Sequence, residues 1–274
     1  MIDDELDGLG KLIAAFSPLV ENLKIVLWDR KVILPLLYRA MIERQFSTLA
    51  IIRWGAQEGY ANALVSLLRQ SCEELIWAKY LSSKPPDISE ALVGILMANE
   101  TTDAIKAQRG AVGDPKLHEW GFSPDFLTNI SKNSATATDT LQQIGEALRW
   151  KKRADEPYRV PSLSWLATEV EERETYDLLY HAASRTVHFS VNHLLRRAWG
   201  NRVDEVEISG KWLETYWAAF LLCYCARLFV ATTIASGEGL KELGIGVDIP
   251  EAPFEALKLI GSRVPIILRE EFNL

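Results

Sequence analysis

Several polar side chains fall on one face of a predicted helix over residues 173–199. At steps of four, three and four residues, this helix carries His181, Arg185, His188 and Asn192. Ser184 lies four residues before His188, and Tyr180 lies four residues before Ser184. Residues three or four apart share a helix face, so the spacing predicts one polar stripe. Imidazole exchanges protons near neutral pH and guanidinium binds phosphate, so such a stripe could bind or cleave a phosphodiester.

A second predicted helix carries an arginine and a glutamate among apolar residues. Arg69 and Glu73 are four residues apart, and Glu74 follows directly. The surrounding leucines and tryptophan predict a buried or half-buried ion pair that faces the polar stripe. The alternative is an ordinary surface pair, which would contribute only about 0.2–0.5 kcal/mol. For the two histidines of the stripe, the alternative to a role in catalysis or binding is a structural one, in which both imidazoles are hydrogen-bonded where two helices meet.

Two segments of the sequence resemble a known family. LLRQSCEELIWAKYL (67–81) contains Arg69-x-x-x-Glu73, and YDLLYHAASRTVHFS (176–190) contains Ser184-x-x-x-His188. This pair of motifs resembles a widespread prokaryotic family of uncharacterised helical proteins. More distantly, the chain resembles the HEPN helical superfamily, many of whose members are metal-independent ribonucleases in toxin–antitoxin and phage-defence systems. Those enzymes place four to six residues between an arginine and a histidine, whereas two residues separate Arg185 from His188 here.

The favoured functional hypothesis is a non-catalytic protein that binds a partner or a ligand. Its centre would be a buried network that fixes the register of the helices, formed by Arg69, Glu73, Ser184 and His188. Three further residues of the stripe are candidate ligand-binding residues, namely His181, Asn192 and Tyr180. The partner would be another protein or a second copy of the chain, and no cofactor is predicted.

The alternative hypothesis, which the distant resemblance implies, is a metal-independent ribonuclease or a nucleotide-binding protein. His188 would act as the general acid or base, while Arg185 and Arg69 would hold phosphate and stabilise developing charge. Glu73 would orient a cationic group, and Ser184 would complete the catalytic set. The ligand would then be RNA or a nucleotide. If the chain is an enzyme, this is the activity that the residues favour.

A metal site is a third hypothesis. Asp177 and His181 are four residues apart, which is sound ligand geometry on a helix, and they could be joined by His188 and by Glu73 or Glu74. The chain has no Glu-x-x-His and no His-Glu-x-x-His motif, so no metal is predicted. It also lacks G-x-S-x-G and the P-loop motif, which disfavours triad hydrolases and P-loop nucleotidases.

The composition is that of a folded helical protein. Of 274 residues, 48% are hydrophobic and 24% are charged, with a formal net charge of −7. These values exclude a disordered chain and a collagen-like chain, and the acidic balance disfavours a protein that coats nucleic acid. Apolar residues recur every three or four positions, with no convincing alternating strand. The sequence therefore predicts an all-α, irregular bundle of about nine or ten helices.

Prolines and glycines predict where the helices begin and end. The first helix is expected to close before Pro18, and one long helix is expected over residues 56–82. Residues 110–124 are predicted to form a loop, and residues 200–210 a turn. We expect a single domain over residues 1–274, with an excursion or subdomain over 110–162.

The most apolar stretch is expected to be a central helix of the bundle. Residues 215–235 are almost long enough to span a bilayer, but Arg227 would lie in the middle of the span, where a charge is costly. We therefore predict no membrane contact. The three cysteines have no spacing typical of a metal or disulfide site, and the acidic N-terminus does not resemble a signal peptide. These features predict a cytoplasmic protein.

Overall fold

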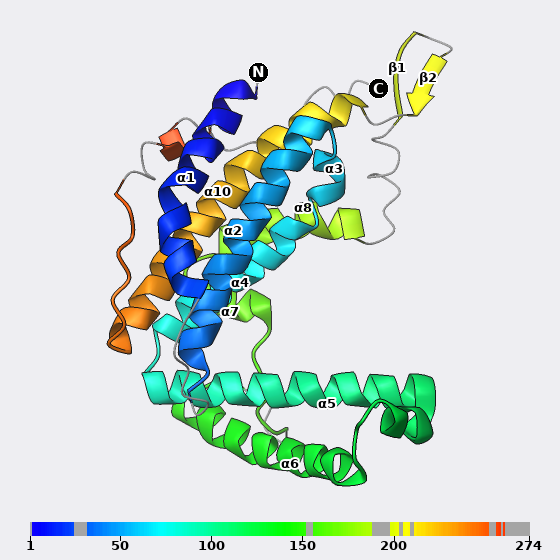
Figure 1. Ribbon diagram of the computed structural model, residues 1–274, viewed down its shortest axis with the longest axis vertical. Coiled ribbons are helices and arrows are strands. Elements are labelled where there is room, and N and C mark those ends of the chain that lie inside the picture. The colour runs from blue at the N-terminus through cyan, green and yellow to red at the C-terminus, as the bar shows by residue number, and fades with distance from the viewer. Residues whose placement is uncertain are drawn as a thin grey trace. The chain divides into compact units, whose positions relative to one another are not determined.

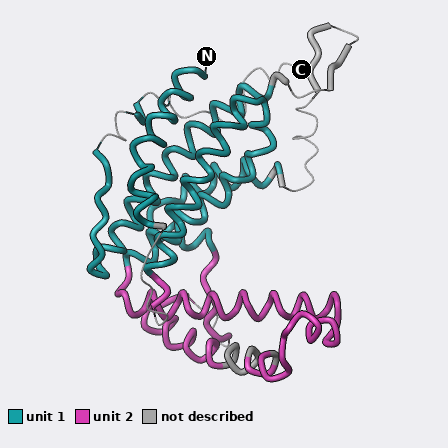
Figure 2. Tube along the Cα trace, in the orientation of Figure 1, with its two compact units in different colours: residues 1–28, 35–83, 163–274 teal, residues 29–34, 84–162 magenta. Residues whose placement is uncertain are grey.

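The computed structural model is built almost entirely of helices (Figure 1). It describes residues 2–24, 32–151, 156–187, 198–202, 205–208, 211–251, 256–258 and 260. Two compact units make up the chain (Figure 2). Unit 1 comprises residues 1–28, 35–83 and 163–274, and unit 2 comprises residues 29–34 and 84–162. The predicted all-α class is confirmed.

Most helices belong to unit 1. They are α1 (Asp3–Lys24), α2 (Leu34–Glu58), α3 (Ala61–Leu64), α4 (Leu67–Ser82), α7 (Leu163–Glu169), α8 (Arg173–Val187) and α10 (Lys211–Glu242). Unit 2 contains two long helices that pack against each other, α5 (Pro86–Glu119) and α6 (Pro124–Ala147). The excursion predicted over 110–162 lies inside unit 2, which begins earlier, at residue 84. The single-domain organisation stays a prediction.

The core of unit 1 is built around α10. This helix packs against α4, α3 and α1, and Met41 of α2, Ala78 of α4 and Ala235 of α10 meet in one buried cluster. Phe229 is fully buried, with its ring 4.8 Å from that of Phe16 in α1. The predicted long apolar central helix is thereby confirmed.

One helix in the described part of the chain, over Leu213–Glu242, is long and apolar enough to cross a membrane. Its most apolar window is 78% buried inside the protein, as is common for the core helix of a soluble protein. Burial alone does not decide where the protein resides, so the cytoplasmic location stays a prediction.

The predicted end of the first helix before Pro18 is wrong, because α1 continues through the proline to Lys24. Proline removes the hydrogen bond to the carbonyl four residues earlier, which belongs to Ala14. Both Ala14 and Pro18 are exposed, so water can satisfy that carbonyl. One buried stripe continues along the helix on both sides of the proline, and it consists of Leu9, Leu12, Phe16, Val20 and Leu23. Burial of this stripe outweighs the cost of the proline.

Two other predicted boundaries fail at glycines. The long helix expected over residues 56–82 is interrupted, because Gly59 adopts a φ of 77° and separates α2 from α3 and α4. Conversely, the predicted loop over 110–124 is largely helical, since α5 continues to Glu119 with a single kink at Gly113 (φ 76°). Leu117, beyond the kink, is fully buried and anchors this end of the helix.

The predicted turn over residues 200–210 is also wrong. This segment is part of a short antiparallel hairpin, in which β1 (Ala198–Arg202) pairs with β2 (Glu205–Ile208). The two strands are joined in register at Ala198 with Ile208 and at Arg202 with Glu205. The hairpin is too small to change the helical class of the protein.

Candidate functional site

The two helices that carry the predicted motifs pack against each other. Helices α4 and α8 are in extensive contact within unit 1. Arg69 Nε donates a hydrogen bond of 2.9 Å to Glu73 Oε1, one turn along α4. The Arg69 guanidinium also lies over the ring of Tyr180 in α8, with 4.6 Å from Cζ to the ring centroid. The side chains of Arg69 and Glu73 are 33% and 37% exposed, so the ion pair is half-buried rather than fully solvated.

A second arginine on α8 repeats this arrangement. Arg173 Nε donates a 2.8 Å hydrogen bond to Asp177, also four residues along, and its guanidinium lies 5.9 Å from the ring centroid of Tyr176. The rings of Tyr176 and Tyr180 are 4.9 Å apart and tilted by 32°. We call the resulting surface the arginine–tyrosine face, and it consists of Arg69, Glu73, Arg173, Tyr176, Asp177 and Tyr180.

Arg69 is held in place through its Nε and through one face of its guanidinium. The hydrogen bond that Arg69 donates to Glu73 raises the pKa of Arg69 above its ordinary value, so the guanidinium keeps its charge at all relevant pH values. Its Nε is occupied by Glu73 and one face lies over Tyr180, but within the described residues its two Nη groups donate no hydrogen bond. A guanidinium uses these two groups to bind a carboxylate or phosphate with two parallel hydrogen bonds.

The remaining residues of the predicted stripe have different environments. His181 is exposed, whereas Ser184 is half-buried and its Oγ has no hydrogen-bond partner in the described part of the chain. Arg185 lies in α8, but its side chain lies outside what the structure describes. His188 and Asn192 also lie outside the described residues. The structure thus joins Arg69, Glu73 and Tyr180, and it leaves the histidine part of the hypothesis as a prediction.

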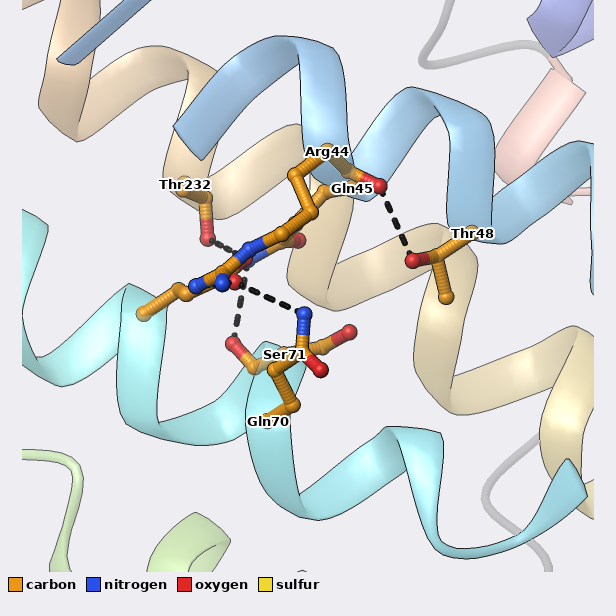
Figure 3. Close-up of polar contacts among 7 residues, drawn as sticks. Arg44, Gln45, Thr48, Gln70, Ser71 and Thr232 are labelled. Carbon is orange, nitrogen blue, oxygen red and sulfur yellow. Dashed lines mark hydrogen bonds and ion pairs between the residues drawn. The ribbon is translucent and has the colours of Figure 1, made fainter. Parts of the chain in front are cut away.

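The buried charge of α4 belongs to Glu74 rather than to Glu73. Figure 3 shows polar contacts among its neighbours, including Arg44, Gln45, Gln70 and Thr232, which come from α2, α4 and α10. Glu74 is only 4% exposed; it forms an ion pair with Arg44 of α2 and accepts a 3.2 Å hydrogen bond from Gln70. Gln45 Nε2 donates to the carbonyl of Ser71 (3.0 Å) and to Thr232 Oγ1 in α10 (2.9 Å). These bonds fix the register of three core helices.

This buried network is incompletely satisfied. Glu74 Oε2 and Gln45 Oε1 are both buried and have no hydrogen-bond partner among the described residues. Burial raises the pKa of Glu74 above its ordinary value, and Arg44 and Gln70 offset only part of that shift. The Arg44 side chain is 57% exposed, so solvent weakens its attraction for the carboxylate. The network therefore joins three core helices at the cost of burying a charge that is only partly compensated.

The hypothesis of a metal site gains no support from the described residues. No group of three or more histidine, cysteine, aspartate or glutamate side chains is close enough there to hold a metal ion. Asp177, which was expected to act with His181, is hydrogen-bonded to Arg173 instead.

Sequence reasoning missed several of these contacts, although some signals were present. Tyr176 lies four residues before Tyr180, and Arg173 lies four residues before Asp177, so both belong to one helix face. Glu74 lies three residues after Ser71 and four before Ala78, both buried, which places it on the core side of α4.

A protein-family model matches residues 34–205, more than half of the chain, and the family it describes is one of unknown function. The matched region includes both motif helices. The predicted resemblance to an uncharacterised family fits this match, whereas HEPN similarity and prokaryotic origin stay predictions. No curated protein and no solved structure matches the chain significantly.

Proposed function

The chain belongs to the DUF5677 family, a family of unknown function, and from its own side chains we propose that it is a non-catalytic binding module. Its ligand carries an oxyanion, a phosphate or a carboxylate, that docks on the arginine–tyrosine face. The observation that carries this proposal is the state of Arg69, a half-buried guanidinium that is anchored through Nε and a ring face and whose two Nη groups donate no hydrogen bond to any described residue.

The anchoring of Arg69 favours binding because it lowers the entropic cost of forming a complex. A free arginine side chain loses rotamer freedom when it binds, and contacts that fix it beforehand reduce this loss. Both tyrosine rings already have neighbours: Tyr180 contacts Arg69 and Tyr176, and Tyr176 also contacts Arg173. The rings thus help to position the two arginines.

The same surface supports a binding role rather than acid–base catalysis. Each arginine keeps its charge and is oriented by a carboxylate four residues away. Burial, followed by the nearby Tyr180, raises the pKa of Tyr176 above its ordinary value, so this phenol stays protonated at neutral pH. A general base needs a group that gains and loses a proton near the working pH.

Replacing Arg69 with glutamine is expected to weaken oxyanion binding at least tenfold. The test is calorimetric titration of the full chain with inorganic phosphate, adenosine monophosphate and acetate, which distinguish phosphate from carboxylate ligands. Glutamine keeps a polar side chain of similar length but loses the charged, paired donors. Because the ion pair is half-exposed, the folded state should lose no more than about 1 kcal/mol.

The matched control is Arg109→Gln. Arg109 forms a comparable ion pair with Asp114, at 2.5 Å and on the surface of unit 2. Its loss should leave the affinity for each anion unchanged. The proposal is wrong if the wild-type protein binds none of the three anions at millimolar concentration, or if Arg69→Gln and Arg109→Gln reduce the affinity equally.

The second candidate function is the metal-independent ribonuclease. One observation favours it: the packing of α4 against α8 places Arg69 on the same helix pair as Arg185 and the segment that leads to His188. In that case the two Nη groups of Arg69 would hold the scissile phosphate and His188 would transfer the proton. This function predicts RNA cleavage that depends on His188.

A further inference from the structure

A pocket of about 240 Å³ lies in unit 1 between α4, α8 and α10. Its walls are largely aliphatic, formed by Leu75, Leu178, Leu179, Leu228 and Ala231. The residues of α8 that line the pocket are Glu174, Thr175, Leu178 and Leu179. Because an α-helix turns by about 100° per residue, they lie on the opposite side of α8 from the residues of the arginine–tyrosine face. The pocket is therefore separate from the surface to which the proposed function is assigned.

Charged groups at the pocket differ in whether they have partners. Glu172 accepts a 2.5 Å hydrogen bond from Lys79, so its charge is compensated. Arg227 also interacts with the rest of the chain. Glu174, in the first turn of α8, has no hydrogen bond or ion pair with any other described residue. Glu174 is thus the pocket carboxylate without a hydrogen-bond or ion-pair partner among the described residues.

From this combination we propose that the pocket binds a small amphipathic amine. The aliphatic walls would surround an apolar body, and the Glu174 carboxylate would pair with the ammonium group. Thr175, which also lines the pocket, supplies a hydroxyl that can accept a further ammonium hydrogen. The volume equals that of about eight liquid water molecules, which suits a ligand the size of one aromatic ring with a short aminoalkyl chain.

The test uses two probes that share one body and differ in charge. The full chain is titrated with phenethylammonium chloride and with sodium 3-phenylpropionate. We expect the ammonium probe to bind and the carboxylate probe to bind at least tenfold more weakly. Glu174→Gln should weaken binding of the ammonium probe at least tenfold, because the variant removes the carboxylate that would pair with the ammonium group. Glu174 is exposed, so the variant is expected to fold.

Two controls separate this site from other effects. Glu58→Gln removes an exposed carboxylate from α2, outside the pocket, and should leave the affinity for the ammonium probe unchanged. Arg69→Gln should also leave it unchanged, so failure of the proposed oxyanion site and failure of this pocket are distinguishable. The inference is overturned if the wild-type protein does not bind the ammonium probe, if Glu174→Gln binds it as well as wild type, or if the carboxylate probe binds more tightly.

Discussion

Phe229→Ala is expected to lower the free energy of unfolding by about 3–5 kcal/mol, as measured by urea denaturation. The ring is fully buried in α10 and makes ring contacts with Phe16 of α1, at 4.8 Å, and Phe46 of α2, at 6.0 Å. Truncation would leave a cavity where three helices meet, because close-packed neighbours collapse only partly into such a space. The size of the loss tests whether α10 is the core helix of a folded protein in water.

Phe126→Ala is the matched control for this prediction. Phe126 lies near the start of α6 and is 42% exposed, so its loss should change the free energy of unfolding by no more than about 0.5 kcal/mol. A loss below about 1 kcal/mol for Phe229→Ala would contradict the packing of α10 described above.

Glu74→Gln is expected to raise the free energy of unfolding by about 1–2 kcal/mol at pH 7, since a buried, imperfectly paired charge is often replaced with a gain. Glutamine keeps an acceptor for Gln70 and adds N–H donors beside Gln45, whose buried Oε1 has no partner in the described part of the chain. The lost attraction to Arg44 is small because that side chain is largely solvated.

The difference in the free energy of unfolding between wild type and Glu74→Gln should depend on pH. Burial raises the pKa of Glu74 in the folded protein. The proton bound there contributes stability that is complete below the ordinary pKa of about 4.5 and is lost as the pH rises through the raised value. The advantage of the glutamine variant should therefore grow between pH 4.5 and pH 7.

The measurement is urea denaturation of both proteins across that pH range. If the difference in the free energy of unfolding stays constant across this pH range, Glu74 has the same pKa in the folded and unfolded states. An advantage that shrinks as the pH rises would show that the attraction of Arg44 outweighs burial. Either result would contradict the account of the buried network.

The helical class and the central helix could be predicted from sequence, because both depend on local patterns. The apolar run of α10 is so continuous that only a buried or membrane-embedded helix could contain it. Boundaries were less predictable. The rule that proline interrupts a helix predicts an end before Pro18, but the buried stripe on both sides of Pro18 stabilises α1 along its whole length. Whether burial of the stripe outweighs the cost of the proline depends on tertiary packing, which cannot be read from one segment of the sequence.

The candidate site was predictable to the extent that its contacts are local. The pairing of Arg69 with Glu73 follows from a spacing of four residues. By contrast, Gln45 and Thr232 are 187 residues apart in sequence, and no local pattern connects them. Tyr180 was predicted as a ligand-binding residue, but in the structure its ring supports Arg69. That contact depends on how α4 packs against α8.

The proposed binding role requires that the protein binds its ligand and does not cleave it. The most direct test incubates wild type and His188→Ala with a single-stranded RNA oligonucleotide, after a thermal melt has shown that both are folded. The account predicts no cleavage by either protein above the buffer control, together with oxyanion binding by wild type that Arg69→Gln loses. Cleavage by wild type that disappears in a His188→Ala protein with an unchanged melt would contradict the account and show that the chain is a ribonuclease.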